Sequence, residues 1–136
     1  MKEKFVLDSY ALLAFFQGGA GGRQVKEILK RARAKRASVH VSVVNMGEIF
    51  YIIARRYGFE KAREIMDDIE SLPIAVEEAG LERVLKATAI KEKSSVAYAN
   101  AFAAALAEEL KAVLVTGDTE FKKLGSIDIL WLYPQN

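Results

Sequence analysis

The stretch Ala112-Val-Leu-Val-Thr-Gly-Asp118, near the carboxyl end of the chain, is an apolar run that stops at an acid. Its aliphatic and β-branched residues predict a short buried strand over 112–116, with Asp118 just beyond the strand end. The chain begins with the same pattern, because Phe5-Val-Leu-Asp8 predicts a strand over residues 4–8. In open α/β sheets, ligands bind at the carboxyl ends of the strands. Both acids are therefore candidates for one functional site.

Between these two stretches, strand-like and helix-like segments alternate. Further short strands are expected at 38–41, 74–76 and 127–132, and helices at 10–16, 23–36, 43–57, 60–71, 77–91, 95–110 and 119–124. Alternation of this kind predicts a parallel sheet with helices on both faces, and right-handed crossovers bring the strand carboxyl ends to one edge. We therefore expect a three-layer α/β/α fold with a central five-stranded parallel sheet, formed by residues 1–136 as a single domain.

Turn and capping residues indicate where these elements begin. The segment 17–22 contains four glycines and predicts a flexible turn. Serine side chains can cap the helices that follow them. The serines in suitable places are Ser9, Ser42, and Ser94 or Ser95.

The composition excludes several classes of protein and site. With 51% hydrophobic and 28% charged residues, the chain of 136 residues is expected to fold rather than remain disordered. The absence of cysteine excludes disulfides, zinc-thiolate sites and cysteine nucleophiles. No apolar run approaches the ~18 residues of a membrane span, and the apolar start lacks a signal cleavage site, so we expect a cytoplasmic protein. Abundant lysine, arginine and glutamate, with only three asparagines and three glutamines, favour a thermophilic source.

Glu48 is an acid on an apolar helix face. Its neighbours one turn away are Val44 and Ile52, so the carboxylate lies on or beside a buried surface. Burial of an unpaired carboxylate is costly, and this predicts a partner. Gly47, in the middle of the same helix, predicts close packing of another element. The alternative is that Glu48 lies at the rim and pairs with a lysine.

Asp8, Glu48 and Asp118 together predict a metal site. Acids brought together from distant parts of a chain repel one another unless a cation joins them, and carboxylates favour a hard ion such as Mg²⁺. The alternative for Asp8 and Asp118 is that each caps the following helix, a role that can coexist with metal binding. Asn100 is the neutral member of this set, and its alternative role is to satisfy the backbone of a neighbouring loop.

Four segments, taken in order along the chain, resemble the PIN-domain family. They are Phe5 to Leu13, Val41 to Glu48, Ser95 to Ala107 and Leu114 to Lys122. The likeness is greatest to the VapC-like toxin endoribonucleases of prokaryotic type II toxin–antitoxin systems. Its most specific part is the Thr-Gly-Asp-x-x-Phe block at 116–121.

This resemblance implies a Mg²⁺- or Mn²⁺-dependent ribonuclease that cleaves single-stranded RNA, forms a homodimer and is held by a cognate antitoxin. By position, Asp8, Glu48 and Asp118 match metal-binding catalytic acids of the family. Asn100 falls on the family's third acid, where it contributes no charge. Ser9 and Thr116 are expected to support the site.

Two other functions stay open at this point. Asn100 favours a catalytically weakened PIN domain that only binds RNA or a protein partner. Another metal-using α/β domain is the third possibility. A haloacid-dehalogenase-type phosphatase, however, requires a second Asp where Tyr10 stands, and the paired acids and late lysine of a receiver domain are absent.

Three further features concern the surface and the only histidine. Helix 23–36 carries many lysines and arginines, which predict an RNA-binding surface or else a solvated face with a Glu27–Arg31 pair. Helix 43–57 is bulky and aromatic, and part of it is expected at a dimer or antitoxin contact. His40 lies in a predicted strand, and we expect a structural role for it.

Overall fold

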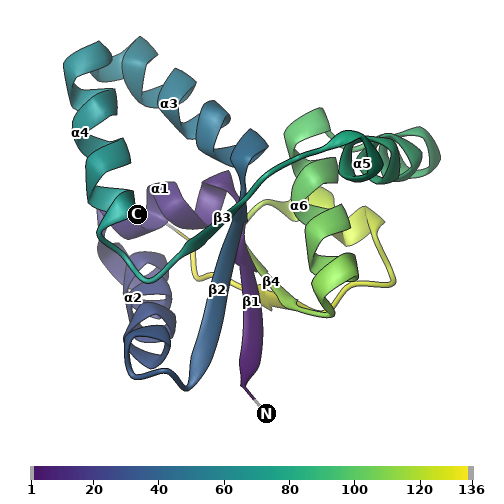
Figure 1. Cartoon of the computed structure of the whole chain (residues 1–136), viewed down its shortest axis with the longest axis horizontal. Helices are drawn as coiled ribbons and strands as arrows, with labels where there is room; N and C mark the ends of the chain where they lie inside the picture. Colours follow the sequence, from purple (N-terminus) through teal and green to yellow (C-terminus); the bar gives the residue numbers. More distant parts are fainter. Residues whose placement is uncertain (1, 135–136) are drawn as a thin grey trace.

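A computed structural model of the chain describes residues 2–134. In these residues five strands form one sheet, and six α-helices pack around it (Figure 1). The strands are β1 (Glu3–Leu7), β2 (Ala37–Ser42), β3 (Ala75–Glu77), β4 (Val113–Thr116) and β5 (Ile129–Trp131). The helices are α1 (Ser9–Gln17), α2 (Gly19–Arg33), α3 (Val43–Tyr57), α4 (Phe59–Glu70), α5 (Leu81–Ser94), α6 (Tyr98–Leu110) and the short 3-10 helix η1 (Thr119–Lys123). Within residues 2–134, no helix combines the length and the apolar character that crossing a membrane requires.

The sheet has the order β3-β2-β1-β4-β5, and every pair of neighbouring strands is parallel. Strand β1 is central, with Phe5 opposite Val39 of β2 on one side and Val113 of β4 on the other. Since all five strands run in one direction, their carboxyl ends share an edge. The predicted five-stranded parallel sheet is confirmed.

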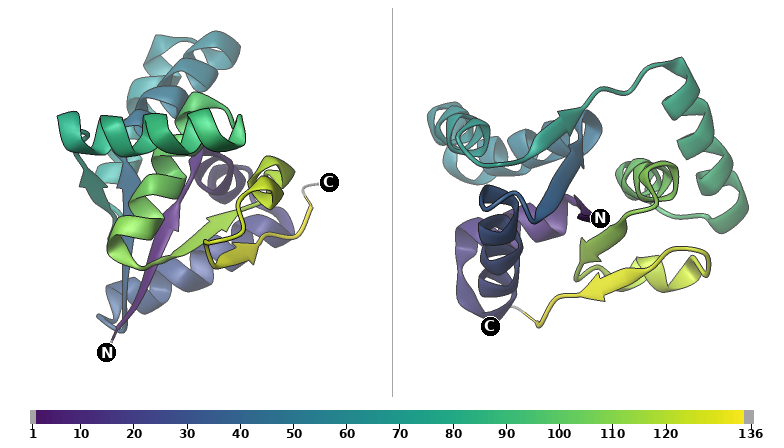
Figure 2. Two further views of the ribbon diagram at one scale, coloured as in Figure 1. Left: turned by 90° about the vertical axis from the view of Figure 1, so that its right-hand side faces the viewer. Right: turned by 60° about the horizontal axis from the view of Figure 1, so that its bottom comes forward.

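Helices cover both faces of this sheet, as the three-layer prediction requires. Figure 1 shows α1 to α4 on one side of the sheet and α5 and α6 on the other, and the right-hand view of Figure 2 shows the same separation. Alternate residues of β1 pack into the two layers: Phe5 and Leu7 belong to the core with α1 to α4, whereas Val6 packs with Ala103 of α6. This period-two alternation is what a strand buried on both faces requires.

The glycine-rich segment 17–22 is mostly helical, so the predicted flexible turn is wrong for its second half. Gly18 and Gly19 have φ values of 80° and 77°, and they make the tight turn between α1 and α2. Gly22 lies inside α2, where an added Cβ would come within 2.5 Å of the Ala14 carbonyl oxygen of α1. The glycines therefore allow close packing of two helices as well as the turn.

Two of the predicted helix caps are also wrong. Asp8, not Ser9, caps α1, since its side chain accepts a hydrogen bond from the Ala11 N–H. Helix α6 begins after Ala97, while Ser95 ends α5 in the left-handed conformation. The Ser42 cap of α3 is confirmed. The predicted helix 77–91 starts only at Leu81, because residues 75–77 form β3.

Candidate active site

Asp8 lies at the end of β1 and is almost completely buried, with 1% of its surface exposed. One carboxylate oxygen accepts the Ala11 N–H at 2.9 Å, and the other accepts the hydroxyl of Thr116. Burial raises the pKa of Asp8 to about 7, against the lowering effect of these two hydrogen bonds. The nearby negative charges of Asp118 and Glu48 raise this pKa further. Asp8 therefore caps a helix and is also a buried acid at the sheet edge.

Thr116 connects the two strand ends that carry acids. Its hydroxyl donates to Asp8 and accepts the Asp118 N–H at 3.0 Å, and its side chain is fully buried. The next residue, Gly117, lies directly against the ring of Tyr10, since a Cβ there would come within 2.2 Å of the ring. Only glycine fits this position without moving the tyrosine. The Thr-Gly-Asp block thus sets the distance between Asp8 and Asp118 through local packing.

Glu48 lies in the first half of α3, at the same edge of the sheet. Its carboxylate accepts the hydroxyl of Ser9, and in the described residues no salt bridge joins it to a lysine. Asn45, one turn earlier, is fully buried and donates to Ser9 at 3.1 Å and to the Ala99 carbonyl at 3.3 Å. The expectation that Gly47 packs against another element is wrong, because the position of its missing Cβ has no neighbour within 4 Å in residues 2–134.

Asn100, on the first turn of α6, faces two acids. Its side-chain nitrogen donates to Asp118 at 3.0 Å and to Glu120 at 2.8 Å. Asp118 caps η1 by accepting the Glu120 N–H at 2.9 Å, and the Glu120 carboxylate also accepts the Ala97 N–H at 2.7 Å. The structure therefore brings Asp8, Glu48, Asp118 and Asn100 to one edge of the sheet, as the sequence predicted.

Comparison with known families identifies this arrangement. The PIN domain family model matches residues 5–127, which is most of the chain. The chain belongs to the PIN-domain family. A comparison with curated protein sequences found no significant match.

Solved PIN-domain toxin structures share the fold at low sequence identity. A chain of VapBC2 from Rickettsia felis has a TM-score of 0.75 and 13% identity, over 96% of this chain and 99% of that chain. DNA-bound VapBC from Salmonella typhimurium has a TM-score of 0.71 and 16% identity, over 94% and 97%. VapC20 from Mycobacterium tuberculosis has a TM-score of 0.67 and 19% identity, over 90% and 95%. These neighbours confirm the predicted VapC-like architecture of this PIN domain.

Two polar residues at this sheet edge are absent from the sequence-based prediction. Glu120 follows Asp118 by two positions, and an acid so close to a candidate ligand was the available signal. Asn45 lies three positions before Glu48 on the same helix face, so a second polar residue on that face was the signal for it. The side-chain oxygen of Asn45 is buried and has no hydrogen-bond partner among the described residues.

The carboxylates of this PIN domain suit a hard divalent ion by their chemistry. Carboxylate oxygens are the ligands that Mg²⁺ and Mn²⁺ prefer. Burial is the main cause of the raised pKa of Asp8, and the charges of Asp118 and Glu48 add a smaller increase. In residues 2–134, however, no three acidic or histidine side chains are already close enough to hold one ion. The carboxylates of Asp8, Glu48 and Asp118 instead accept hydrogen bonds from hydroxyl and amide groups. Metal binding therefore requires some of these carboxylates to rotate.

His40 has the structural role expected of it. It lies between Ser38, at 3.0 Å from one ring nitrogen, and Glu77, at 2.8 Å from the other. Glu77 in turn contacts Arg83, which makes a two-point pair with Glu109. These contacts join β2, β3, α5 and α6 and leave His40 away from the acids listed above as site candidates.

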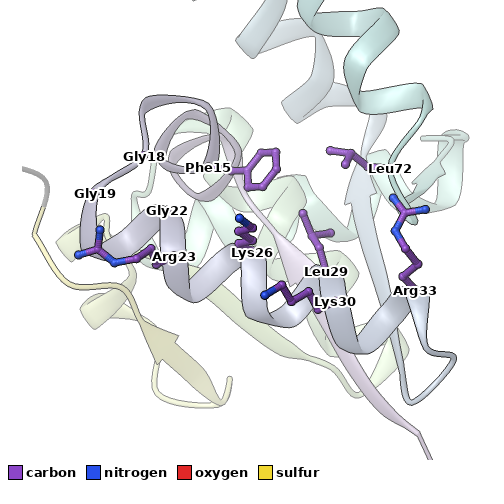
Figure 3. A pocket seen from close by; sticks show the side chains of 10 residues that line it. All are labelled: Phe15, Gly18, Gly19, Gly22, Arg23, Lys26, Leu29, Lys30, Arg33 and Leu72. Carbon is purple, nitrogen blue, oxygen red and sulfur yellow. The ribbon is translucent and has the colours of Figure 1, made fainter.

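The basic helix α2 lines a hollow of about 530 Å³ at the end of α1 remote from Asp8 (Figure 3). Its cationic side chains and the ring of Phe15 surround the hollow: Arg23, Lys26, Lys30 and Arg33. The predicted Glu27–Arg31 pair is wrong, because Arg31 pairs with Glu3 at 2.7 Å and Glu27 with Lys30 at 3.4 Å. The positive surface thus lies away from the sheet edge that carries Asp8.

Proposed function

We propose that this PIN domain, formed by residues 1–136, is a metal-dependent endoribonuclease that cleaves single-stranded RNA and acts as the toxin of a type II toxin–antitoxin pair. The observation that carries the proposal is the convergence of Asp8, Glu48 and Asp118 at one sheet edge, around a buried acid whose pKa is about 7. Buried acids with strongly shifted pKa values are concentrated at functional sites.

In this proposal Asp8, Glu48 and Asp118 bind Mg²⁺ or Mn²⁺, and Asn100 adds a neutral oxygen. The ion would lower the pKa of a bound water and neutralise charge on the phosphoryl oxygens. Thr116 orients Asp8 and Ser9 orients Glu48 through the hydrogen bonds already present. Attack by water predicts products with 5′-phosphate and 3′-hydroxyl ends, and no protein nucleophile takes part.

Several observations support RNA as the substrate. VapC20, which shares the fold, is a toxin that cleaves the sarcin–ricin loop. Phosphates need positive surface, and the cations that line the hollow in Figure 3 offer it on helix α2. Of these, Arg23, Lys26 and Arg33 have no ion pair with the described residues.

A small antitoxin protein and a second copy of the chain are the proposed partners. The similar structures from Rickettsia felis and Salmonella typhimurium are VapBC assemblies, and one from Klebsiella pneumoniae is a toxin–antitoxin complex. Helices α1, α3 and α4 line an apolar hollow of about 380 Å³, with Phe16, Ile52 and Ile65 in its wall. The exposed Tyr57 lines this hollow, and the exposed Tyr51 and Phe59 belong to the same helices, α3 and α4. An amphipathic helical segment of an antitoxin suits such a surface.

The test is cleavage of a defined single-stranded RNA with Mg²⁺ or Mn²⁺, followed by analysis of the product ends. We expect cleavage by the wild type, loss of cleavage with a chelator, and loss in Asp8→Asn and Asp118→Asn. Glu108→Gln, an exposed acid near the other end of α6, is the matched control and should cleave normally. Products with 2′,3′-cyclic phosphate would contradict the mechanism, because they report attack by the ribose hydroxyl.

A second function is favoured by one observation, the amide at Asn100. A PIN domain with too little negative charge to hold its metal would bind RNA or a partner without cleaving it. Such a protein would bind RNA equally well with and without Mg²⁺, and its Asp8→Asn variant would bind as the wild type does. The cleavage assay and a parallel binding assay separate the two functions.

A further inference from the structure

Glu120 is an acid of this site that neither the sequence resemblance nor the cap of η1 accounts for. Its carboxylate is half-buried and lies within hydrogen-bonding distance of the Asn100 side-chain nitrogen, at 2.8 Å. The same nitrogen lies 3.0 Å from an oxygen of Asp118. One neutral NH₂ group therefore sits between two carboxylates, at a place where a cation would be attracted.

The position of Glu120 is fixed from several sides. Its backbone N–H donates to Asp118 at 2.9 Å, and its carboxylate accepts the Ala97 N–H at 2.7 Å. Ala97 directly precedes the 13-residue helix α6, whose amino end stabilises negative charge. Lys123, at 3.9 Å, is a distant and exposed partner. The Glu120 carboxylate is thus fixed beside Asp118, on the element that follows it.

Charge explains why this acid matters in this chain. Asn100 leaves the set formed by Asp8, Glu48 and Asp118 with one carboxylate fewer than the resemblance implies. Glu120 contacts the side-chain amide of Asn100, the residue that stands where the resemblance implies an acid. Glu120 therefore places a carboxylate next to that position. Affinity for a divalent ion in a partly buried site depends strongly on the number of nearby charges.

We infer that Glu120 supplies the carboxylate that Asn100 lacks and is a further metal-binding residue of this site. The inference rests on the proposed function, because it concerns the metal that the ribonuclease would use. The competing explanation is purely structural: Ala97 has no side chain that can cap α6, and Glu120 caps the helix from a distance.

Glu120→Gln separates the two explanations. Glutamine keeps an oxygen that accepts the Ala97 N–H, but it removes the negative charge. The measurement is calorimetric titration with Mn²⁺ alone, together with the melting temperature of each metal-free protein. Glu108→Gln is the control for loss of one acid elsewhere, and Asp8→Asn is the reference for a lost ligand.

We expect Glu120→Gln to weaken Mn²⁺ binding by about tenfold or more, with a metal-free melting temperature close to that of the wild type. The double variant Asn100→Asp, Glu120→Gln should regain most of the lost affinity, because it returns one carboxylate to the same corner. Glu108→Gln should bind as the wild type does. Unchanged affinity in Glu120→Gln, or a double variant that binds no better than Glu120→Gln, would overturn the inference.

The outcomes also distinguish this inference from the proposed function. If Asp8→Asn loses Mn²⁺ binding while Glu120→Gln retains it, the metal site stands and only the role of Glu120 falls. If the wild type itself binds no Mn²⁺, the metal site and the role of Glu120 fall together. If Mn²⁺ binds as expected but RNA stays intact, the role of Glu120 stands and the ribonuclease proposal falls.

Discussion

The hydroxyl of Thr116 donates to the carboxylate of Asp8 and so joins the ends of β4 and β1, which are 108 positions apart in the sequence. Both side chains are buried, and the same hydroxyl accepts the Asp118 N–H. One threonine therefore fixes the relative positions of two candidate metal-binding acids. Its hydrogen bond also lowers the pKa of Asp8 against the larger effect of burial.

Thr116→Val should destabilise the protein by about 1–3 kcal/mol, since it leaves a buried carboxylate without its donor. Thr116→Ser keeps the hydroxyl and should retain most of the lost stability. Urea unfolding at one pH measures both variants against the wild type. Equal stabilities for the valine and serine variants would show that the hydrogen bond contributes little and that packing of the methyl group dominates.

The metal-free protein should lose stability as the pH rises from about 4 to about 7, because of Asp8. Its pKa is about 7 in the folded chain, against the ordinary pKa of 3.8 for an exposed aspartate. The folded state thus binds the proton of Asp8 more tightly than the unfolded state does. The stabilisation from this proton is complete below the unfolded-state pKa and is lost as the pH rises through the folded-state pKa. The slope is at most about 1.4 kcal/mol per pH unit.

Asp8→Asn isolates this effect, because the amide keeps the helix cap but does not titrate. The difference in unfolding free energy between wild type and variant, measured from pH 4 to pH 8 with a chelator, should change in that window and level off above it. A constant difference across the range would contradict the raised pKa of Asp8.

Substitution of two helical glycines by alanine should change the stability of the protein in opposite directions. Gly47→Ala in α3 should stabilise the protein by about 0.5–1 kcal/mol, because the added methyl meets no atom of the described residues within 4 Å. Gly22→Ala in α2 should destabilise it by about 1–3 kcal/mol, because the methyl would lie 2.5 Å from the Ala14 carbonyl oxygen. Thermal unfolding of the two variants compares them directly. The same sign for both would show that helix propensity alone governs these positions.

These glycines also show which features the sequence predicts and which it does not. An apolar run that ends in an acid is a local signal, and it placed Asp8 and Asp118 at one sheet edge correctly. Whether a glycine gives flexibility or close packing depends on a second helix, as Gly22 and Gly47 illustrate. The partners of Asn100 depend on how α6 meets η1, so Glu120 was missed. The thermophilic source and the homodimer stay predictions.

Tyr57→Glu should weaken binding of the proposed antitoxin by about tenfold or more. Tyr57 lines the apolar hollow between α1, α3 and α4 and is 69% exposed, and a carboxylate there would lose solvation on contact with a partner. Tyr133→Glu is the matched control, because Tyr133 is similarly exposed but lies after β5. Calorimetry with the proposed antitoxin measures both variants against the wild type, and equal affinities would exclude this hollow as the contact.

Asn100→Asp should change stability in opposite directions with and without metal. Without metal, the substitution removes the NH₂ group that donates to Asp118 and Glu120 and adds a third carboxylate beside them. The lost hydrogen bonds and the added repulsion should lower the metal-free melting temperature.

With saturating Mn²⁺ the order should reverse, because the extra carboxylate strengthens attraction for the ion and binding stabilises the folded state. The substitution hardly changes side-chain volume, so packing of α6 against the sheet is a minor factor. Cleavage of RNA should rise most at low metal concentration. Melting curves of both proteins with chelator and with Mn²⁺ give the comparison. A variant that melts lower under both conditions, with unchanged Mn²⁺ affinity, would show that Asn100 is a structural amide outside the metal site.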